Sequence, residues 1–257
     1  SSKNGNFSAD VRIFEEALDE TSGGVFWKQM GSSLYGKFAY ARLGRALALS
    51  SDGLRIACGA NEFQGDGPGY AQVYDYNGTE WNQLGQDLVG DKDHDLFGRD
   101  IALSKDGLIL AVGANYGTDS GPSTGYVYVY ELVTSTDGSS STWRQLGRKL
   151  TGEEEEDRFG ETIALSSSGN RLVVGASQKT KVGKGYVQIF DLVENMNGVQ
   201  DWKQAGQDFN GEMSGDRFGS YVKLSGDGGV MAAGAVGSDA NGDDSGQLRV
   251  FKVLTLS

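Results

Sequence analysis

Cysteine, histidine and proline are scarce in this sequence, and each scarcity narrows what the protein can be. Of 257 residues, one is Cys, one is His and two are Pro. The single Cys58 excludes an internal disulfide, and within "RIACGA" it is expected to be a small buried apolar residue. The single His94 argues against a Ser–His–Asp triad or a His-ligated metal centre, so we expect an exposed loop residue.

Basic charge and long apolar runs are also lacking. Lys and Arg number 23 against 35 Asp and Glu, which gives a formal charge of −12. This argues against a nucleic-acid partner, which needs clustered cations, and suits a cation or a basic partner. No apolar run approaches the ~18 residues of a membrane span. No signal peptide is visible, and the opening "SSKNG" is expected to be a mature or cut end.

What the chain does contain is glycine, 40 residues of it, much of it at repeating positions. Four landmarks occur four times each: a Trp in "W-x-Q", the Gly of "FG" or "LG", a turn Gly, and the Gly of "GA". Each landmark steps by 54, then 62, then 59 residues, beginning with Trp27, Gly44, Gly53 and Gly59. The stretch from Trp to "GA" therefore has one fixed length, and all length variation lies between "GA" and the next Trp.

Each copy predicts four short strands. In the second copy they are 99–104, which alternates, 108–114, which is apolar on both faces, 126–132, and the Trp strand near 143. A turn such as "KDG" joins the first two as a tight hairpin. Antiparallel four-stranded units at this period predict an all-β propeller, with the first strands innermost and the Trp strands outermost.

The sequence predicts one propeller domain over residues 1–257, with four blades in this chain. The repeats centre on 27–75, 81–131, 143–191 and 202–253. The four copies each contain a third strand, and "VRIF" (11–14) is a fifth segment of this kind. Residues 1–20 are therefore either surplus or a closing N-terminal strand. In the simplest closure the first Trp strand completes the last blade. In the alternative, the chain belongs to a larger ring of five to seven blades.

These motifs resemble a known family. "FG" fifteen residues before "GA", followed by "GYVYVY", is similar to the FG-GAP repeat of integrin-α-type β-propellers. The variant with "W-x-Q-L-G", "D-x-F-G" and "LSxDG" resembles secreted and cell-surface proteins of marine bacteria and algae. The resemblance implies a binding propeller outside the cell or on its surface. The family's DxDxDG calcium loop is missing, since "SKDGL" and its counterparts carry too few carboxylates for Ca²⁺.

Repeated residues are expected to be scaffold, and residues that differ between copies are expected to carry function. The Asp of "D-x-F-G" (Asp95, Asp157 and Asp216) is expected to accept backbone N–H bonds in a tight turn. The loops before the first strand and after the second strand share one face of a propeller, and here that face is strongly acidic. Its candidate ligand-binding residues are Tyr40, Phe63, Asp66, Tyr116, Asp119, Glu153, Glu154, Glu155, Glu156, Lys179 and Lys181.

Two of these loops also resemble partial calcium loops. "DKDHD" places carboxylates at alternate positions, and "SDANGDD" gathers oxygens on a glycine-containing loop, but both lack a distal Glu. The candidate metal ligands are Asp91, Asp93, Asp95, Asp239, Asn241, Asp243 and Asp244. A bound cofactor is otherwise not expected. The sequons "NFS" at Asn6 and "NGT" at Asn77 are candidate glycosylation sites, although "NG" alone also makes a hairpin turn.

The function that the sequence favours is non-catalytic binding. The acidic loop face is expected to meet a partner protein, a glycan or a divalent cation, and a solvated rim that only keeps the protein soluble is the plainer interpretation. An enzyme is the alternative: a hydrolase would use two carboxylates of the same face, although no pair stands out.

Overall fold

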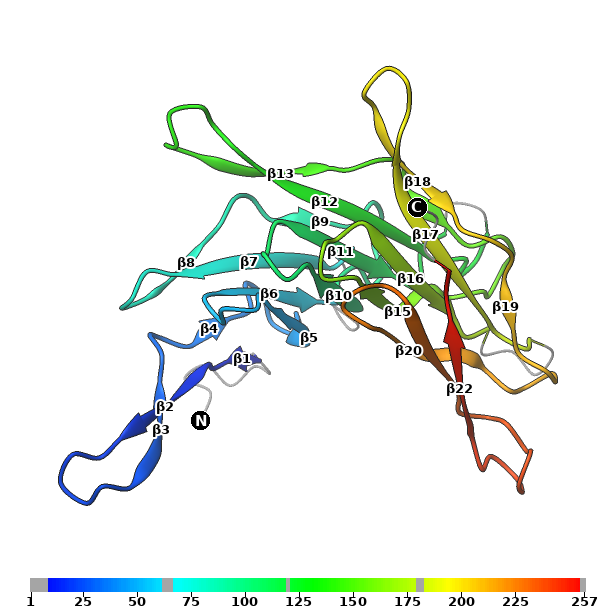
Figure 1. Cartoon of the computed structure of the whole chain (residues 1–257), viewed down its shortest axis with the longest axis horizontal. Helices are drawn as coiled ribbons and strands as arrows, with labels where there is room; N and C mark the ends of the chain where they lie inside the picture. Colours follow the sequence, from blue (N-terminus) through cyan, green and yellow to red (C-terminus); the bar gives the residue numbers. More distant parts are fainter. Residues whose placement is uncertain (1–8, 62–66, 119–120, 179–182, 255–257) are drawn as a thin grey trace.

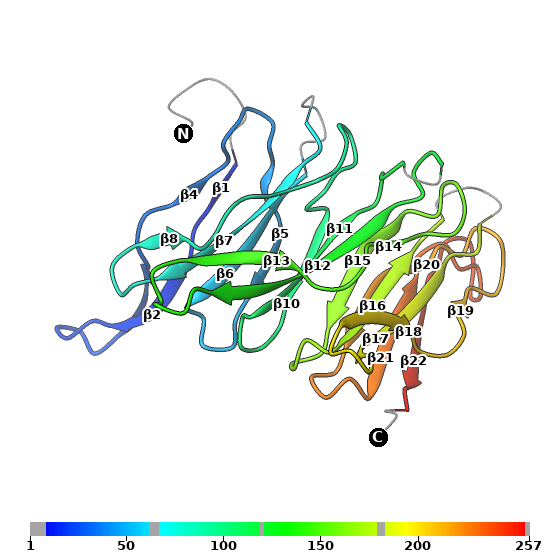
Figure 2. The same ribbon diagram turned by 90° about the horizontal axis from the view of Figure 1, so that it is seen from above.

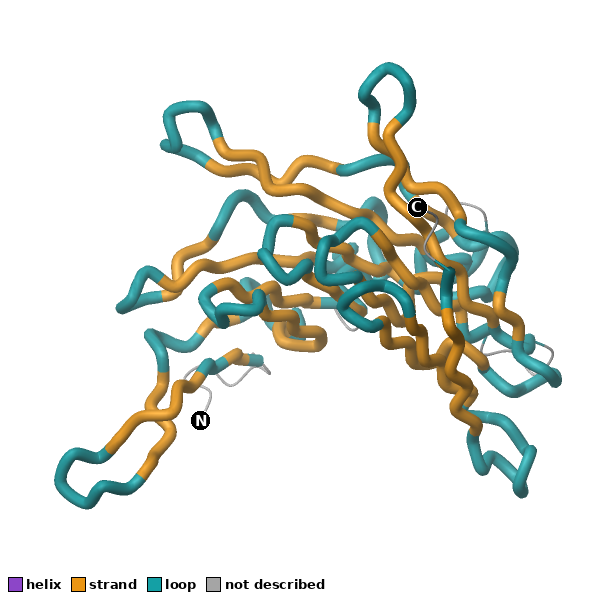
Figure 3. The backbone as a smooth tube through the Cα atoms, viewed as in Figure 1, coloured by secondary structure: helices purple, strands orange, loops and turns teal. Residues whose placement is uncertain are grey.

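The computed structural model describes residues 9–61, 67–118, 121–178 and 183–254. Within these ranges every regular element is a β-strand, as Figure 3 shows, so no helix that could cross a membrane occurs among them. The strands form sheets that fan out around a common axis (Figure 1). The predicted all-β propeller with four blades is confirmed.

Three blades are complete and have the same strand order. In each, the first strand lies innermost, the strand with the Trp lies outermost, and a two-residue strand pairs with the third strand beside it. Blade 1 contains β5 (Leu43–Leu49), β6 (Arg55–Ala60), β7 (Tyr70–Tyr76), β8 (Trp81–Gln83) and β9 (Leu88–Val89). Blade 2 contains β10 (Asp100–Leu103), β11 (Ile109–Ala114), β12 (Tyr126–Thr134), β13 (Ser141–Gln145) and β14 (Leu150–Thr151). Blade 3 contains β15 (Phe159–Leu165), β16 (Arg171–Ala176), β17 (Tyr186–Glu194), β18 (Gln200–Gln204) and β19 (Phe209–Asn210).

The two ends of the chain supply incomplete blades. Blade 4 has three strands, β20 (Phe218–Leu224), β21 (Val230–Ala235) and β22 (Gln247–Lys252). The N-terminal segment forms two strand pairs, β1 (Asp10–Val11) with β4 (Leu34–Tyr35) and β2 (Phe14–Leu18) with β3 (Val25–Gln29). In both Figure 1 and Figure 2 the β2–β3 hairpin and β22 lie at opposite ends of the molecule.

The predicted closure by the first Trp strand is therefore wrong for this structure. β3 pairs with β2, with Glu16 opposite Trp27, and β22 pairs only with β21 among the described strands. The physical reason lies in the hairpin itself. Residues 19–24 close a turn in which Asp19 accepts backbone N–H bonds, and Lys28 forms an ion pair with Glu15 at 3.3 Å. The first Trp strand thus pairs with a third strand of its own, β2, which begins at the last residue of "VRIF".

The hairpin turns between the first two strands of each blade follow one local design. In blade 2 the Ser104 hydroxyl donates to Asp106 at 2.6 Å, Asp106 accepts the Leu108 N–H at 3.0 Å, and Gly107 has φ of 73°. Asp52 and Asp227 repeat these bonds in blades 1 and 4. The bonds hold the ionised carboxylates, which lowers the pKa of Asp52 and of Asp227. The turn motif "S-x-D-G" is therefore a scaffold feature.

Close backbone contact between neighbouring blades explains the glycine of "GA". A Cβ added at Gly113 would lie 2.2 Å from the backbone oxygen of Gly160 in the next blade. Gly59 and Gly175 meet the next blade in the same way, at 2.3 and 2.2 Å. Only glycine allows blades to pack this closely, so the repeat encodes the junction between blades as well as each blade.

Candidate functional site

The Asp residues of "D-x-F-G" lie in the turns at the loop face and are buried. Asp157 Oδ2 accepts the N–H groups of Glu153 and Glu154, both at 2.9 Å, and the Tyr186 hydroxyl at 2.7 Å. Asp216 holds its turn with the same two backbone bonds, and Asp95 accepts one of them, from the Lys92 N–H. Each carboxylate is thus used within its own turn, which supports the structural role expected from the sequence.

Asp95 differs from its counterparts in one respect. Its Oδ2 accepts the Tyr126 hydroxyl at 2.8 Å and the Lys92 N–H, but its buried Oδ1 has no hydrogen-bond partner in the described structure. Burial raises the pKa of Asp95 above its usual value, against the lowering effect of the Tyr126 hydrogen bond. This oxygen is enclosed in the turn, so it is poorly placed to join the exposed Asp93 around one cation.

The two predicted calcium loops are only partly available to a cation. Asp91 accepts the Tyr128 hydroxyl at 3.1 Å and contacts the Lys149 ammonium at 2.5 Å. In the other loop, Asp239 accepts the Asp244 N–H at 2.7 Å, and Asn241 and Asp243 are exposed. Among the described residues no group of three or more His, Cys, Asp or Glu side chains is arranged to hold a metal ion. Calcium binding stays a prediction.

Several other predicted residues lie on this face. Glu153, Glu154 and Glu155 are exposed in succession, and Glu156 is half-buried at φ of 64°. Tyr116 lies under the Arg158 guanidinium, 5.1 Å from the ring centre, and Tyr40 is 38% exposed. The predicted residues that fall outside the described ranges are Asn6, Phe63, Asp66, Asp119, Lys179 and Lys181.

The sequence drew attention to Cys58 and His94 by their scarcity and to Asn77 by its sequon, and the structure gives each an ordinary environment. Cys58 is fully buried in β6, and burial raises the pKa of its thiol to about 12. His94 is an exposed residue of the turn before blade 2. Asn77 is exposed, but its side chain accepts the N–H groups of Thr79 and Glu80 and so shapes the hairpin.

The central axis carries a set of charged side chains that sequence reasoning missed, among them an ion pair of Arg99 with Glu161 at 3.1 Å. A cavity of about 510 Å³ is lined by Arg45, Arg99, Asp100, Glu161 and Lys223, from the innermost strands of all four blades. Burial and the neighbouring Arg99 lower the pKa of Arg45. These positions differ from blade to blade, and only the inward direction of the first strands, which the propeller sets, brings them together.

A smaller polar cavity of about 210 Å³ opens at the loop-face end of the axis. It is lined by Arg42, Leu96, Arg158, Asn61 and Asn115, together with Arg99, Tyr116 and Glu161. The buried Oδ1 atoms of Asn61 and Asn115 and the buried Nε of Arg158 have no hydrogen-bond partner within the described structure. Unpaired buried polar atoms are costly, so this opening is suited to a polar ligand. We call it the axial mouth.

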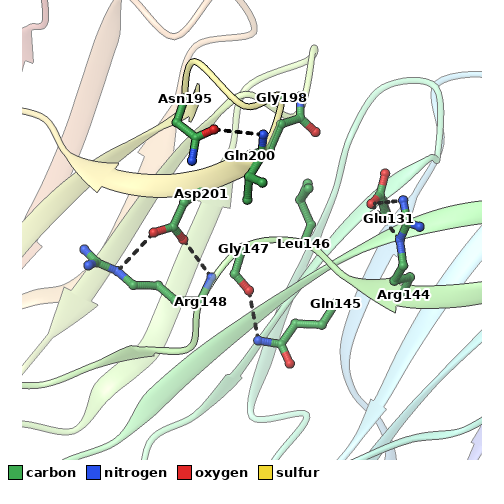
Figure 4. A pocket seen from close by; sticks show the side chains of 11 residues that line it. Glu131, Arg144, Gln145, Leu146, Gly147, Arg148, Asn195, Gly198, Gln200 and Asp201 are labelled. Carbon is green, nitrogen blue, oxygen red and sulfur yellow. Dashed lines mark hydrogen bonds and ion pairs between the residues drawn. The ribbon is translucent and has the colours of Figure 1, made fainter.

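A groove of about 550 Å³ lies away from the loop face, between the outer strands of blades 2 and 3. Figure 4 shows its charged side chains paired across short distances. Arg144 donates to Glu131 at 2.8 Å, and Asp201 accepts the Arg148 N–H at 2.7 Å. Because these charges are already satisfied, the groove offers less to a ligand than the loop face.

Comparison with known proteins supports the fold. Residues 91–130 match the FG-GAP repeat family. The chain is also similar to the crystal structure of Sqt1 from Chaetomium thermophilum, with 20% identity, a TM-score of 0.53, and coverage of 83% of this chain and 44% of that one. That likeness concerns the fold alone, and this chain spans less than half of the Sqt1 chain. No curated protein matches the sequence. The matched stretch runs through β10, β11 and most of β12, and its landmarks recur in every blade, so the chain is a β-propeller that carries an FG-GAP repeat at residues 91–130.

Proposed function

We propose that the protein is a non-catalytic binding propeller whose acidic loop face recognises a positively charged partner protein. One observation carries this proposal: the turn that displays Glu153, Glu154 and Glu155 is fixed by the buried Asp157, while all three glutamates are exposed. Glu153 is also held in place, because its Oε1 accepts the Gln188 amide at 3.0 Å. Variable charged residues on a rigid frame are the usual design of a binding surface. The partner would be met outside the cell or at its surface, as the resemblance to secreted repeat proteins suggests.

The test is a calorimetric titration with an arginine-rich peptide of about twelve residues, carried out at low and at physiological salt. We expect binding that weakens as salt screens the charges. The triple variant E153Q/E154Q/E155Q should bind at least about fivefold more weakly, since close interfacial charge pairs are worth more than about 1 kcal/mol. The control E16Q/E20Q/E194Q removes the same charge from exposed positions on other parts of the molecule.

The two variants separate specific recognition from net charge. Equal weakening in both would show that the peptide senses only the overall charge of −12, and an unchanged affinity in the loop variant would overturn the proposal. Adding millimolar Ca²⁺ to the same titration tests whether a bound cation takes part in recognition by the acidic loop face. If Ca²⁺ binds the folded chain it raises the melting temperature, by mass action, and D91N/D93N removes that shift when the "DKDHD" loop is the site.

A second candidate function rests on the axial mouth. Arg99 in this opening is paired with Glu161 at 3.1 Å, and Arg158 lies 3.9 Å from Glu156. The remaining donor capacity of its arginines and the unpaired Asn61 and Asn115 oxygens suit a glycan that carries both an anionic group and hydroxyl donors. We expect a uronic acid disaccharide to bind wild type more tightly than the N61A/N115A variant. Equal, weak binding to both would leave the acidic rim as the functional surface.

A further inference from the structure

The axial mouth is built from equivalent positions of successive blades. The residue two positions before the first glycine of each blade's first strand supplies Arg42, Leu96 and Arg158, and the residue after "GA" supplies Asn61 and Asn115. The first three residues have φ of 55–58°, a left-handed conformation that side chains rarely adopt. Blades 1, 2 and 3 provide this lining, so the site lies among the complete blades, and its turns hold the lining residues in fixed places.

An ion pair closes the inner end of the mouth. Arg99 donates to Glu161 Oε1 at 3.1 Å, and the other carboxylate oxygen of Glu161 accepts the Ser177 hydroxyl. Arg99 and Glu161 line both the mouth and the larger axial cavity, so their pair lies between the two spaces. We call this pair the floor of the mouth. A molecule that enters from the loop face therefore stops at the floor.

The size of the mouth limits what it can hold. Its volume of about 210 Å³ is below the roughly 300–1,000 Å³ of pockets that enclose a whole drug-sized ligand. The mouth therefore takes one end of a larger molecule, such as the last ring of a sugar chain. An internal sugar ring is less suitable, because its neighbours on both sides would have to leave through the same opening.

Unpaired buried atoms define the hydrogen bonds that an occupant must make. Asn61 and Asn115 are 2% and 1% exposed, and their Oδ1 atoms lack donors in the described structure, while the buried Nε of Arg158 lacks an acceptor. In blade 3 the equivalent position is Ser177, whose hydroxyl donates to Glu161 within the protein. A sugar hydroxyl both donates and accepts, so neighbouring hydroxyls of one ring suit this set of two acceptors and one donor.

The charges of the mouth orient a sugar that carries a carboxylate. Glu161 at the floor repels a second carboxylate, whereas Arg42 is exposed at the opening. Arg158 is 18% exposed, and its nearest carboxylate, Glu156, is 3.9 Å away. The hydroxyls of the bound ring therefore face inward, and its carboxylate faces outward toward the two arginines.

The acidic loop face around the mouth limits the charge of the remaining chain. Glu153, Glu154 and Glu155 are exposed in the turn that directly precedes Arg158, and the whole chain has a formal charge of −12. Further carboxylates along a glycan would lie over this acidic surface and be repelled. The sugars beyond the mouth are therefore expected to be neutral.

We propose that the axial mouth binds the terminal uronic acid of an otherwise neutral glycan chain. The hydroxyls of the terminal ring contact Asn61 and Asn115, and its carboxylate meets Arg42 and Arg158. The next sugar leaves across the loop face. This inference rests on the second candidate function above, and it adds which sugar of the glycan is bound and what charge the others carry.

The probes are four trisaccharides of glucose with one type of linkage. They carry glucuronic acid at the non-reducing end, in the middle, at all three positions, or nowhere. In calorimetric titrations we expect the terminal acid to bind at least about tenfold more tightly than the middle acid or the neutral probe. The fully acidic probe should bind more weakly than the terminal acid at low salt and approach it as salt screens the repulsion.

Variants of the chain locate the site. R158Q should reduce the preference for the terminal acid over the neutral probe at least about fivefold. R217Q is the matched control, because Arg217 has φ of 55° at the same turn position of blade 4, carries the same charge and does not line the mouth. N61A/N115A should weaken the terminal acid at least about tenfold without lowering the melting temperature, because the lost oxygens are unpaired.

Each contrary result has a distinct meaning. Equal binding of the terminal and middle acids would overturn the inference and leave glycan binding by the mouth intact. Absence of binding by all four probes at millimolar concentration would overturn the second candidate function as well. Equal effects of R158Q and R217Q would show that the acid senses only net charge. A melting temperature that falls in N61A/N115A would assign the two asparagines to the scaffold, and either result would overturn the inference.

Discussion

Equivalent residues of the repeat are buried where two blades meet inside the propeller and exposed on the outer faces of the first and last blades. Ile101, Ile163 and Val222 occupy one position of the first strand and are 2–5% exposed, whereas Leu47 at that position in blade 1 is 51% exposed. Gly113 touches the next blade, whereas Gly234 meets nothing closer than 3.8 Å. The burial of a repeated residue is thus supplied by the neighbouring blade, and its contribution to stability depends on whether that blade is present.

The largest expected difference is between two tryptophans. Trp143→Ala should lower the free energy of unfolding by about 3–5 kcal/mol, because it removes a buried indole and its bond to the Leu84 carbonyl. Trp27→Ala should change it by less than about 0.5 kcal/mol, because a substitution at an exposed site loses few contacts. Urea unfolding of both variants beside wild type measures the difference. Equal losses would mean that Trp27 is also packed.

The glycines of "GA" give the next largest difference. Gly113→Ala forces a Cβ against the Gly160 backbone oxygen and should cost about 2–3 kcal/mol, the range for overpacking against groups that cannot move aside. Gly234→Ala has open space and should leave the melting temperature unchanged or slightly higher. Thermal unfolding checks both. A large loss in Gly234→Ala would reveal a neighbour on the outer face of blade 4.

A smaller difference separates scaffold carboxylates from displayed ones. Asp157→Asn should cost about 1–3 kcal/mol, because one Asn atom becomes a donor among groups that already donate to Asp157. Glu154→Gln, three residues earlier and exposed, should fall within about 0.5 kcal/mol of wild type. Chemical denaturation of the pair decides between the roles. If the two changes cost the same, the Asp of "D-x-F-G" is not the residue that holds the turn.

The smallest effect concerns pH. Burial between blades raises the pKa of Asp100 above the usual value of 3.8, against the lowering effect of its bond from the Ile163 N–H. An acid whose pKa is raised by folding holds its proton more tightly in the folded state, so it loses stabilising effect as pH rises from about 3.8 through its folded value. Relative to D100N, wild type should lose stability over that window. A gain over the same window would show that ionised Asp100 is favoured by its hydrogen bonds.

The sequence was sufficient to predict the strands and turns within each blade but not the contacts between neighbouring blades. Strand order and hairpin turns depend on neighbours within one repeat, and the fixed distances from Trp27 to Gly59 and their copies encode them directly. The packing of a Trp against the preceding blade depends on two repeats at once. Its sequence signal was the Gly four residues after each Trp, which occurs four times, but only the packing of blades shows that Trp143 lies against Gly85.

The candidate site was predicted less completely than the fold. The acidic residues of the loop face were found because charge is visible in a sequence. The arginines of the axis were missed because Arg42, Arg99 and Arg158 come from separate repeats and converge only around the axis. The closure was mispredicted because strand count favoured Trp27 as the missing strand.

The most direct test of the account is quenching of tryptophan fluorescence by acrylamide, in wild type and in W27F. The structure places Trp27 at 70% exposed and the other three tryptophans at 7% or less. We predict that the emission of wild type contains a readily quenched fraction and that W27F loses nearly all of it. A quenched fraction that persists in W27F, or wild-type emission that is protected throughout, would contradict the claim that neighbouring blades bury the other three tryptophans and leave Trp27 exposed.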